Sequence, residues 1–125
     1  MTRERKDLGR LAEGMAKAFL RKQGYRILET NFRDRLGEID VIALDGMTVC
    51  FVEVKTRRSE ASGGPFEAVD PRKIGRIVRA SRAYRAKNRL HDVPVRFDVV
   101  AVRVLLDATL DGTLVKGAFM EDGWG

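Results

Sequence analysis

The pattern of apolar and polar residues is clearest between Gly37 and Lys55, where two β-rich runs, residues 38–44 and 48–55, follow one another. They meet at Asp45-Gly46, and Asp-Gly between such runs is typical of a hairpin turn. Because side chains alternate across a strand, a connecting loop of even length puts one set from both runs on the same face. That predicted face is entirely apolar and consists of Ile39, Val41, Ala43, Cys50, Val52 and Val54.

The opposite face of this predicted hairpin changes from apolar to charged along its length. Near the turn it carries Ile42, Leu44, Val49 and Phe51, and at the open end it carries Glu38, Asp40, Glu53 and Lys55. A two-residue loop places Asp40 diagonal to Glu53, and a four-residue loop places the two directly opposite, so both registers bring these carboxylates within cross-strand reach. A loop of odd length would separate them unless a bulge intervened. The spacing therefore predicts an acidic cluster at one end of the hairpin.

Apolar residues at three- and four-residue steps predict two helices. The first ends near Gly24, a typical C-cap glycine. Its core-facing stripe is predicted to be Leu8, Leu11, Ala12, Met15, Ala16 and Phe19. The second begins at Asp70-Pro71, which suits an N-cap and a first helical position, and runs to about Leu90. Its core side is predicted to be Ile74, Ile77, Val78, Ser81 and Tyr84.

Three further strands are predicted over residues 25–32, 96–106 and 113–120, the last at the sheet edge after a turn at Asp111-Gly112. Residues 56–69 have the composition of a loop, with residues 62–65 as its most flexible point. Asp98 interrupts an apolar run; it either makes hydrogen bonds at the start of its strand or lies near the site, and we favour the first interpretation. The order α-β-β-β-α-β-β predicts an α/β fold, with a central mixed β-sheet flanked by helices.

Composition narrows the class of protein. A length of 125 residues with 44% hydrophobic and 34% charged residues predicts one domain over residues 1–125. The single cysteine, Cys50, excludes an internal disulfide and is expected to be a small core residue, while one histidine excludes a His-rich metal cluster. No apolar run approaches the roughly 20 residues that span a bilayer, and the charged N-terminus lacks the apolar core of a secretory signal. We therefore expect a cytoplasmic protein without a membrane partner.

The net charge of +6 and the isoelectric point of about 9.9 favour a polyanionic partner. The second predicted helix accounts for the whole excess, because it has no acidic residue and carries Arg72, Lys73, Arg76, Arg79, Arg82, Arg85, Lys87 and Arg89. A solvated helix face usually mixes both signs, and like charges at these spacings repel. Contact with phosphates is therefore the better interpretation for Arg72, Lys73, Arg76, Arg79 and Arg82, and for Arg57 and Arg58 after the hairpin.

The acidic cluster suits metal-dependent phosphodiester cleavage. Asp40 and Glu53 could hold Mg²⁺ or Mn²⁺, since hard divalent cations take one or two carboxylates plus waters and phosphate oxygens. The carbonyl of Val54 could add an oxygen, and Lys55 could orient the attacking water or neutralise developing charge. The alternative is an ion-pair ladder in which Lys55 neutralises Glu53, but it does not explain the crowding of other acids at the same end.

Two other glutamates leave alternatives open. Glu13 would complete the acidic cluster if the first helix packs across this end of the sheet; otherwise it forms an exposed ion pair with Lys17. Glu38 shares the charged face, but its position alone does not distinguish a metal ligand from a residue that supports one.

At these residues the sequence resembles the PD-(D/E)xK nuclease superfamily, which has a restriction-endonuclease-like fold. It is similar in particular to the YraN-type family of predicted bacterial endonucleases, which are themselves similar to archaeal Holliday-junction resolvases. The resemblance covers about residues 9–102 and rests chiefly on the blocks GEID and VEVKTR, in that order, so residues 103–125 would be a C-terminal strand and tail. The superfamily's proline before the first acid is absent, since Ile39 precedes Asp40.

By position, the resemblance implies that Asp40 and Glu53 are metal-binding acids, that Lys55 is the motif lysine, and that Glu13 is the N-terminal helix glutamate of the resolvase-like branch. It implies a metal-dependent endonuclease that cleaves DNA, with structured or branched DNA as the expected substrate. Symmetric cleavage of two strands would require a homodimer. Two alternatives remain: a non-catalytic nucleic-acid binder that retains the fold, and a scaffold protein whose basic helix binds an acidic protein.

Overall fold

The predicted order of elements is confirmed by the computed structural model, which describes residues 3–58, 70–107 and 109–121. The seven elements are α1 (Arg3–Lys22), β1 (Arg26–Asp34), β2 (Gly37–Asp45), β3 (Thr48–Arg58), α2 (Pro71–Lys87), β4 (Val95–Val104) and β5 (Leu110–Phe119). The fold class is therefore α/β, and the arrangement agrees with a restriction-endonuclease-like fold.

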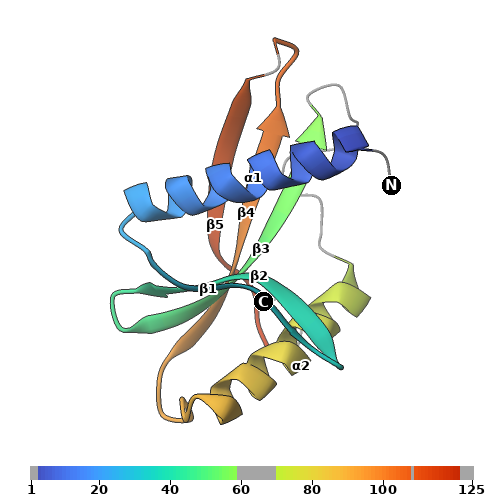
Figure 1. Cartoon of the computed structure of the whole chain (residues 1–125). Helices are drawn as coiled ribbons and strands as arrows, with labels where there is room; N and C mark the ends of the chain where they lie inside the picture. The colour runs from blue at the N-terminus through green and yellow to red at the C-terminus, as the bar shows by residue number, and fades with distance from the viewer. Residues whose placement is uncertain (1–2, 59–69, 108, 122–125) are drawn as a thin grey trace.

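The five strands form one sheet in the order β1-β2-β3-β4-β5. Neighbouring strands are antiparallel except for β3 and β4, which are parallel. A parallel pair needs a crossover connection, and α2 lies within it. Figure 1 shows α1 crossing the sheet on one side and α2 packed on the other side, beside β1 and β2. The sheet is thus mixed, and each face has its own apolar core.

The core under α1 is built on small residues of the helix. Ala12, Ala16 and Leu20 repeat every four positions and are buried against β2, β3 and β4. Leu11 was predicted to belong to this stripe, but its side chain is 62% exposed, because the contact line follows Ala12 and leaves its neighbour on the outer side. The predicted C-cap is confirmed: Gly24 has a φ of +91°, and the N–H of Tyr25 donates to the Leu20 carbonyl at 2.9 Å.

The core under α2 is aromatic. The predicted cap is confirmed, since the Asp70 carboxylate accepts the N–H of Arg72 at 2.8 Å and Pro71 begins the helix. The predicted core residues of α2 are all buried, and Tyr84 packs edge-on against Phe32 at 5.2 Å between ring centroids. The helix ends at Lys87, three residues before the expected end.

The β2–β3 hairpin has an even register that runs from the pair Asp45–Thr48 to the pair Val41–Val52. The predicted apolar face is confirmed except at Ile39, which lies in the core under α2 instead. Two local features accompany this change of face. Asn31 of β1 has a φ of +53°, and the Asp40 carboxylate accepts the N–H of Val54 at 2.8 Å.

The connections differ from prediction in two places. β1 extends to Asp34, so the turn before β2 is shorter than the gap between the predicted strands over residues 25–32 and 38–44. Asp111-Gly112 is not a turn but part of edge strand β5, where Gly112 pairs with Val102; the chain turns earlier, where the N–H of Leu105 donates to the Thr109 carbonyl at 2.8 Å. Residues 62–65 lie outside the described residues, as does most of the predicted loop over residues 56–69.

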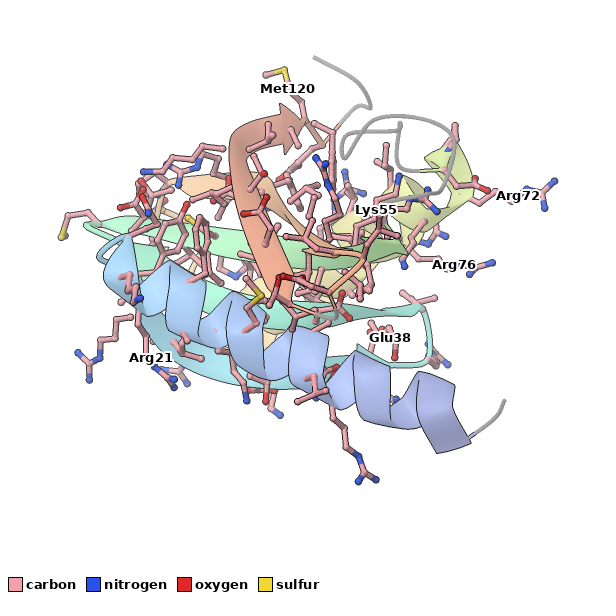
Figure 2. The ribbon with its side chains drawn as sticks, turned by 90° about the horizontal axis from the view of Figure 1, so that it is seen from above. Arg21, Glu38, Lys55, Arg72, Arg76 and Met120 are labelled. Atoms are coloured by element: carbon pink, nitrogen blue, oxygen red, sulfur yellow. The ribbon has the colours of Figure 1, made fainter. Side chains whose placement is uncertain are left out.

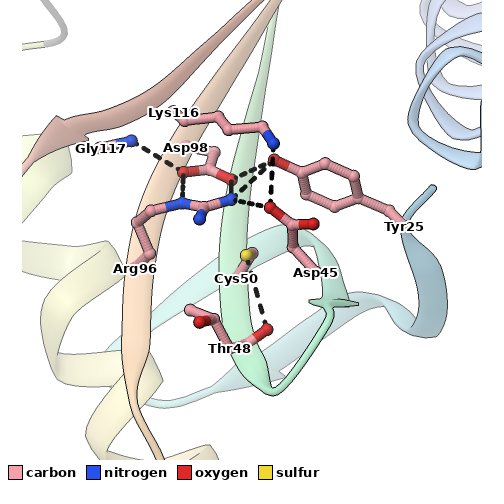
Figure 3. A network of polar contacts seen from close by, with 8 residues as sticks. All are labelled: Tyr25, Asp45, Thr48, Cys50, Arg96, Asp98, Lys116 and Gly117. Carbon is pink, nitrogen blue, oxygen red and sulfur yellow. Dashed lines mark hydrogen bonds and ion pairs between the residues drawn. The ribbon is translucent and has the colours of Figure 1, made fainter. Parts of the chain in front are cut away.

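A buried polar network lies at the Asp45 end of the hairpin (Figure 3). Asp98 has no exposed surface and accepts four hydrogen bonds, from the Tyr25 hydroxyl at 2.7 Å, from two nitrogens of Arg96 at 2.8 and 3.0 Å, and from the N–H of Gly117 at 2.9 Å. The preferred interpretation of Asp98, as a hydrogen-bonding residue at the start of its strand, is confirmed. Cys50 is buried nearby, and burial raises the pKa of its thiol to about 12.

Neither helix among the described residues combines the length and apolar character that a bilayer crossing requires. The expected single domain over residues 1–125 and the cytoplasmic location stay predictions.

Candidate metal and nucleic-acid site

Asp40 and Glu53 meet at the open end of the hairpin. The strand pairing ends at Val41–Val52, and directly beyond it the side chains of Asp40 and Glu53 form a hydrogen bond with each other. Glu53 is buried, with 5% of its surface exposed, while Asp40 is half-buried and its Oδ2 is held by the Val54 N–H. The strands thus fix one carboxylate by burial and the other by a main-chain hydrogen bond.

Glu53 has an unusual electrostatic environment. Burial is the main cause that raises its pKa, the Asp40 carboxylate raises it further, and the value reaches about 8 even though Lys73 lowers it. The Nζ of Lys73 lies 2.9 Å from Glu53 Oε1. Partial burial lowers the pKa of Lys73, but the hydrogen bond and charge of Glu53 outweigh that effect, so the pKa of Lys73 is raised. A negative charge at Glu53 is therefore unfavourable unless a cation compensates it.

The partner of Glu53 was not predicted. The sequence-based alternative paired Glu53 with Lys55 on the same strand, and assigned Lys73 to phosphate contact only. The structure brings Lys73 to Glu53 from the first turn of α2, and the predicted pairing with Lys55 stays a prediction. No local spacing reveals this contact, because it depends on the crossover that returns α2 to the sheet; the Asp-Pro start of the helix was the available signal.

A cleft of about 310 Å³ opens at this end of the sheet. The cleft lies between the end of β3 and the start of α2. Its lining consists of Glu53, Val54, Lys55, Thr56, Arg57, Asp70 and Lys73. Three of these, Glu53, Val54 and Lys55, were predicted to be site residues because of their place in the hairpin. In Figure 2, Lys55, Arg72, Arg76 and Glu38 lie toward the same end of the view, away from Arg21. The cleft therefore adjoins the basic side of α2.

Glu13 and Glu38 do not join the acidic pair. Glu13 is half-buried on α1, which packs on the sheet face opposite α2, and Glu38 is exposed in an ion pair with Arg33 at 2.9 Å. Among the described residues, no group of three or more Asp, Glu, His or Cys side chains is placed to hold a metal ion. Nor does the described part of the chain contain the alternative ion pair between Glu13 and Lys17. The roles predicted for both glutamates stay predictions.

The basic residues of α2 form an exposed surface. Arg72, Lys73, Arg76, Arg79 and Arg82 all have exposed side chains, as a phosphate-binding role requires. The surface is not purely basic, however, since Glu121 forms ion pairs with Arg82 at 3.7 Å and with Arg85. Arg57 is half-buried in the cleft, whereas the side chain of Arg58, the last residue of β3, lies outside what the structure describes.

A larger hollow of about 510 Å³ lies elsewhere, between β4 and the end of β5. It is mainly apolar and contains none of the predicted site residues; its lining is Val95, Arg96, Phe97, Gly117, Phe119, Met120 and Glu121. The smaller cleft is therefore the better candidate for chemistry, because it holds convergent charged groups and a carboxyl with a perturbed pKa.

The oxygen donors at and next to the smaller cleft fit a hard divalent cation. Glu53 and Val54 line the cleft, and Asp40, which forms a hydrogen bond with Glu53, supplies the second carboxylate from outside the lining. Mg²⁺ and Mn²⁺ prefer oxygen ligands, and Mg²⁺ commonly uses only one or two carboxylates plus water and phosphate oxygens. The burial of Glu53 next to a like charge also fits, because a bound cation would relieve the repulsion.

The fold and the cleft define an α/β protein with a carboxylate pair beside a basic helix, and sequence comparison specifies its family. The chain matches the uncharacterised protein family UPF0102 over residues 12–102. UPF0102 proteins of Geotalea uraniireducens and Syntrophotalea carbinolica are 45% and 44% identical to it; the alignments cover 93% and 99% of this chain, and 91% and 100% of theirs. One from Desulforapulum autotrophicum is 48% identical, over 98% of this chain and 100% of its own.

The chain belongs to the UPF0102 family, the YraN-type family that the sequence motifs indicated. The printed names of these three relatives state no activity or ligand. The family therefore supports the fold and the extent of the resemblance, and the chemistry rests on the site.

Proposed function

We propose that this protein is a Mg²⁺- or Mn²⁺-dependent endonuclease that hydrolyses phosphodiester bonds of structured or branched DNA. The observation that carries the proposal is the buried carboxyl of Glu53, whose pKa is raised, facing Asp40 at a cleft that also holds Lys55. A protein gains no stability from two acids in this arrangement, whereas a phosphate-cleaving site needs them to hold a cation.

Each residue of the cleft has a distinct role in the proposal. Asp40, Glu53 and the Val54 carbonyl would hold the cation, which when bound supplies Lewis acidity to the scissile phosphate and to water. The Val54 N–H fixes the orientation of the Asp40 carboxylate. Lys55 lines the same cleft and would orient the attacking water or neutralise charge that develops on the phosphate.

The basic residues would bind the DNA backbone. The exposed cations of α2 lie beside the cleft, so phosphates bound along the helix lead to the carboxylate pair. Phosphate contacts fix position without reading sequence, so we expect recognition of DNA structure rather than of a base sequence. Cleavage of two strands at a symmetric branch would require two copies of the chain.

The test is cleavage of labelled single-stranded, duplex, flap and four-way junction DNA with Mg²⁺ or Mn²⁺. Wild type is expected to cut at least one substrate only with the metal, and Glu53→Ala is expected to abolish cleavage. Asp92→Ala is the matched control, because it removes an exposed carboxylate between α2 and β4, outside the cleft. Cleavage that persists in Glu53→Ala would refute the assignment of this site.

A non-catalytic nucleic-acid binder is the second candidate, and one observation favours it. Lys73 already neutralises part of the Glu53 charge at 2.9 Å, as an ion pair without a metal would. Such a binder would hold DNA equally well with a chelator and with Mg²⁺ and would cut none of the substrates. The same set of substrates therefore separates the two candidates.

A further inference from the structure

The turn between β1 and β2, here called the β1–β2 tip and comprising residues 34–37, is held in one conformation. The carboxylate of Asp34 accepts the N–H of Leu36 at 2.9 Å and the N–H of Gly37 at 3.1 Å. Gly37 packs directly on the main chain of α2, where an added Cβ atom would overlap the Arg76 carbonyl oxygen. Hydrogen bonds and this close contact thus fix the tip both internally and against the helix.

The fixed tip presents an apolar side chain between cations. Leu36 is 47% exposed, and both Arg35 and Arg76 are exposed beside it. These three residues help to line a hollow of about 360 Å³, together with Arg33, Asp34, Gly37 and Glu38. Arg33 is paired with Glu38, but within the described part of the chain neither Arg35 nor Arg76 has a carboxylate partner. The tip therefore combines exposed apolar surface with positive charge.

The opposite end of β2 offers an internal comparison. Met47 at the β2–β3 turn is even more exposed, at 84%, and yet none of the described hollows includes it. The acid beside it, Asp45, forms ion pairs with Arg96 and Lys116, so these two cations are already neutralised. The two turns of β2 therefore differ, because Leu36 lies next to arginines that have no carboxylate partner within the described part of the chain.

This combination suits one kind of DNA feature. Arginines bind phosphates, and an apolar side chain contacts a base face at least cost where stacking does not already cover it, since unstacking a continuous duplex costs free energy at every step. A continuous duplex covers its base faces, whereas the stack is interrupted where strands branch. We infer that the β1–β2 tip contacts the branch point of structured DNA, with Leu36 against an exposed base pair and Arg35 and Arg76 on the flanking phosphates.

The tip and the cleft are close enough to bind one DNA molecule. Leu36 lies in the turn directly before β2 and precedes Asp40 by four residues, so the two are at most about 13 Å apart at about 3.3 Å per residue. One DNA strand advances about 3.4 Å per nucleotide, so the branch would lie within roughly four nucleotides of the cleaved phosphate. This inference rests on the proposed function, since it assumes that DNA is the ligand.

The test compares binding of a four-way junction and of a linear duplex of equal length, without divalent metal, for wild type, Leu36→Ala and Met47→Ala. Leu36→Ala is expected to lower the junction-over-duplex affinity ratio roughly fivefold or more, because the lost contact is specific to the branch. Met47→Ala, which removes a more exposed apolar side chain from the other turn, is expected to leave the ratio unchanged. Leu36→Met, which keeps an apolar side chain of similar size, should retain most of the wild-type ratio.

A fluorescent adenine analogue at the branch adds a direct readout, since wild type should change its emission and Leu36→Ala should not. An unchanged ratio for Leu36→Ala, or equal wild-type affinity for junction and duplex, would overturn the inference. Failure of the proposed function has a different signature, namely no metal-dependent cleavage by wild type. If wild type cleaves DNA with metal and Leu36→Ala leaves the affinity ratio unchanged, the proposed nuclease function is retained and only the role of the β1–β2 tip is rejected.

Discussion

Two carboxylates are buried in this sheet, and their surroundings differ completely. Asp98 has no exposed surface and accepts hydrogen bonds from Tyr25, Arg96 and Gly117, so every direction of its charge is compensated. Glu53 is almost as deeply buried, but it faces another acid and has one lysine, at the rim of a cleft. Both lie on adjacent parallel strands, so the difference does not arise from depth in the fold.

The comparison shows how a structural acid can be told from a candidate functional one. Where buried donors fully surround a carboxylate, its ionised form stabilises the fold. Where burial and a like charge together raise the pKa, the ionised form is unfavourable until another cation binds. Asp98 belongs to the first kind, and Glu53 has the properties of the second.

The largest expected effect follows from removing the structural acid. Asp98→Ala leaves the buried Tyr25 and the partly exposed Arg96 without their shared acceptor, and we expect it to lower the free energy of unfolding by about 3–5 kcal/mol. Urea denaturation at neutral pH measures the loss. Tyr25→Phe is the matched control, since it removes one donor to Asp98 and one acceptor of Arg96 and is expected to cost about 1 kcal/mol. Equal losses from the two variants would contradict the central role of Asp98.

Replacing the candidate functional acid, Glu53, is expected to raise the free energy of unfolding rather than lower it. Glu53→Gln keeps the size of the side chain and removes the repulsion with Asp40, so without divalent metal we expect a gain of about 1 kcal/mol, limited by loss of the Lys73 ion pair. The variant should lose the stabilisation by Mg²⁺ that wild type shows in thermal unfolding. Glu38→Gln changes an exposed acid on the same hairpin. It should neither raise the stability without metal nor remove the stabilisation by Mg²⁺.

The pH dependence of stability, compared between wild type and Glu53→Gln, gives a sharper test. The folded pKa of Glu53, about 8, lies above its ordinary value of 4.5, so the folded state binds the extra proton. Its contribution to stability is present below pH 4.5 and is lost as the pH rises through 8. Metal-free wild type should therefore lose stability, relative to Glu53→Gln, between these values. A difference that does not vary with pH would refute the raised pKa.

The smallest effect is expected at Asp45, which borders the network of Asp98 but is partly exposed. Hydrogen bonds from Arg96 and then Lys116 lower its pKa below the ordinary value of 3.8. Its contribution is therefore present above pH 3.8 and is lost as the pH falls through the lower folded value. We expect Asp45→Asn to cost about 0.5 kcal/mol at pH 7 and to match wild type in strong acid, as urea denaturation at both pH values would show.

Local rules predicted much of this fold. Alternation in the hairpin predicted that Asp40 and Glu53 would come together, and the caps at Asp70 and Gly24 were predicted from residue type alone. Each of these features depends on neighbours in sequence or on one strand pairing. The features that were missed depend on more distant contacts.

Three residues illustrate that limit. Leu11 satisfies the helical spacing, but the direction from which the sheet approaches α1 leaves it exposed. Gly112 follows Asp111 as in a turn, but it lies in β5, where it pairs with Val102 of β4. Lys73 was predicted to be one of the phosphate-binding cations of the second helix, but the crossover between β3 and β4 brings it into an ion pair with Glu53. In each case the deciding partner lies in another helix or strand.

The contact of Gly37 with the main chain of α2 also makes the start of β2 rigid relative to the helix. Where side chains meet, rotamer changes can absorb a mismatch, but here main chain meets main chain and only a shift of the whole strand could do so. If this region binds DNA as proposed, a rigid DNA molecule would have to bend to fit it, and the energy of bending depends on the stiffness of the DNA. Selectivity would then favour flexible or already bent DNA, independently of any group that the protein touches.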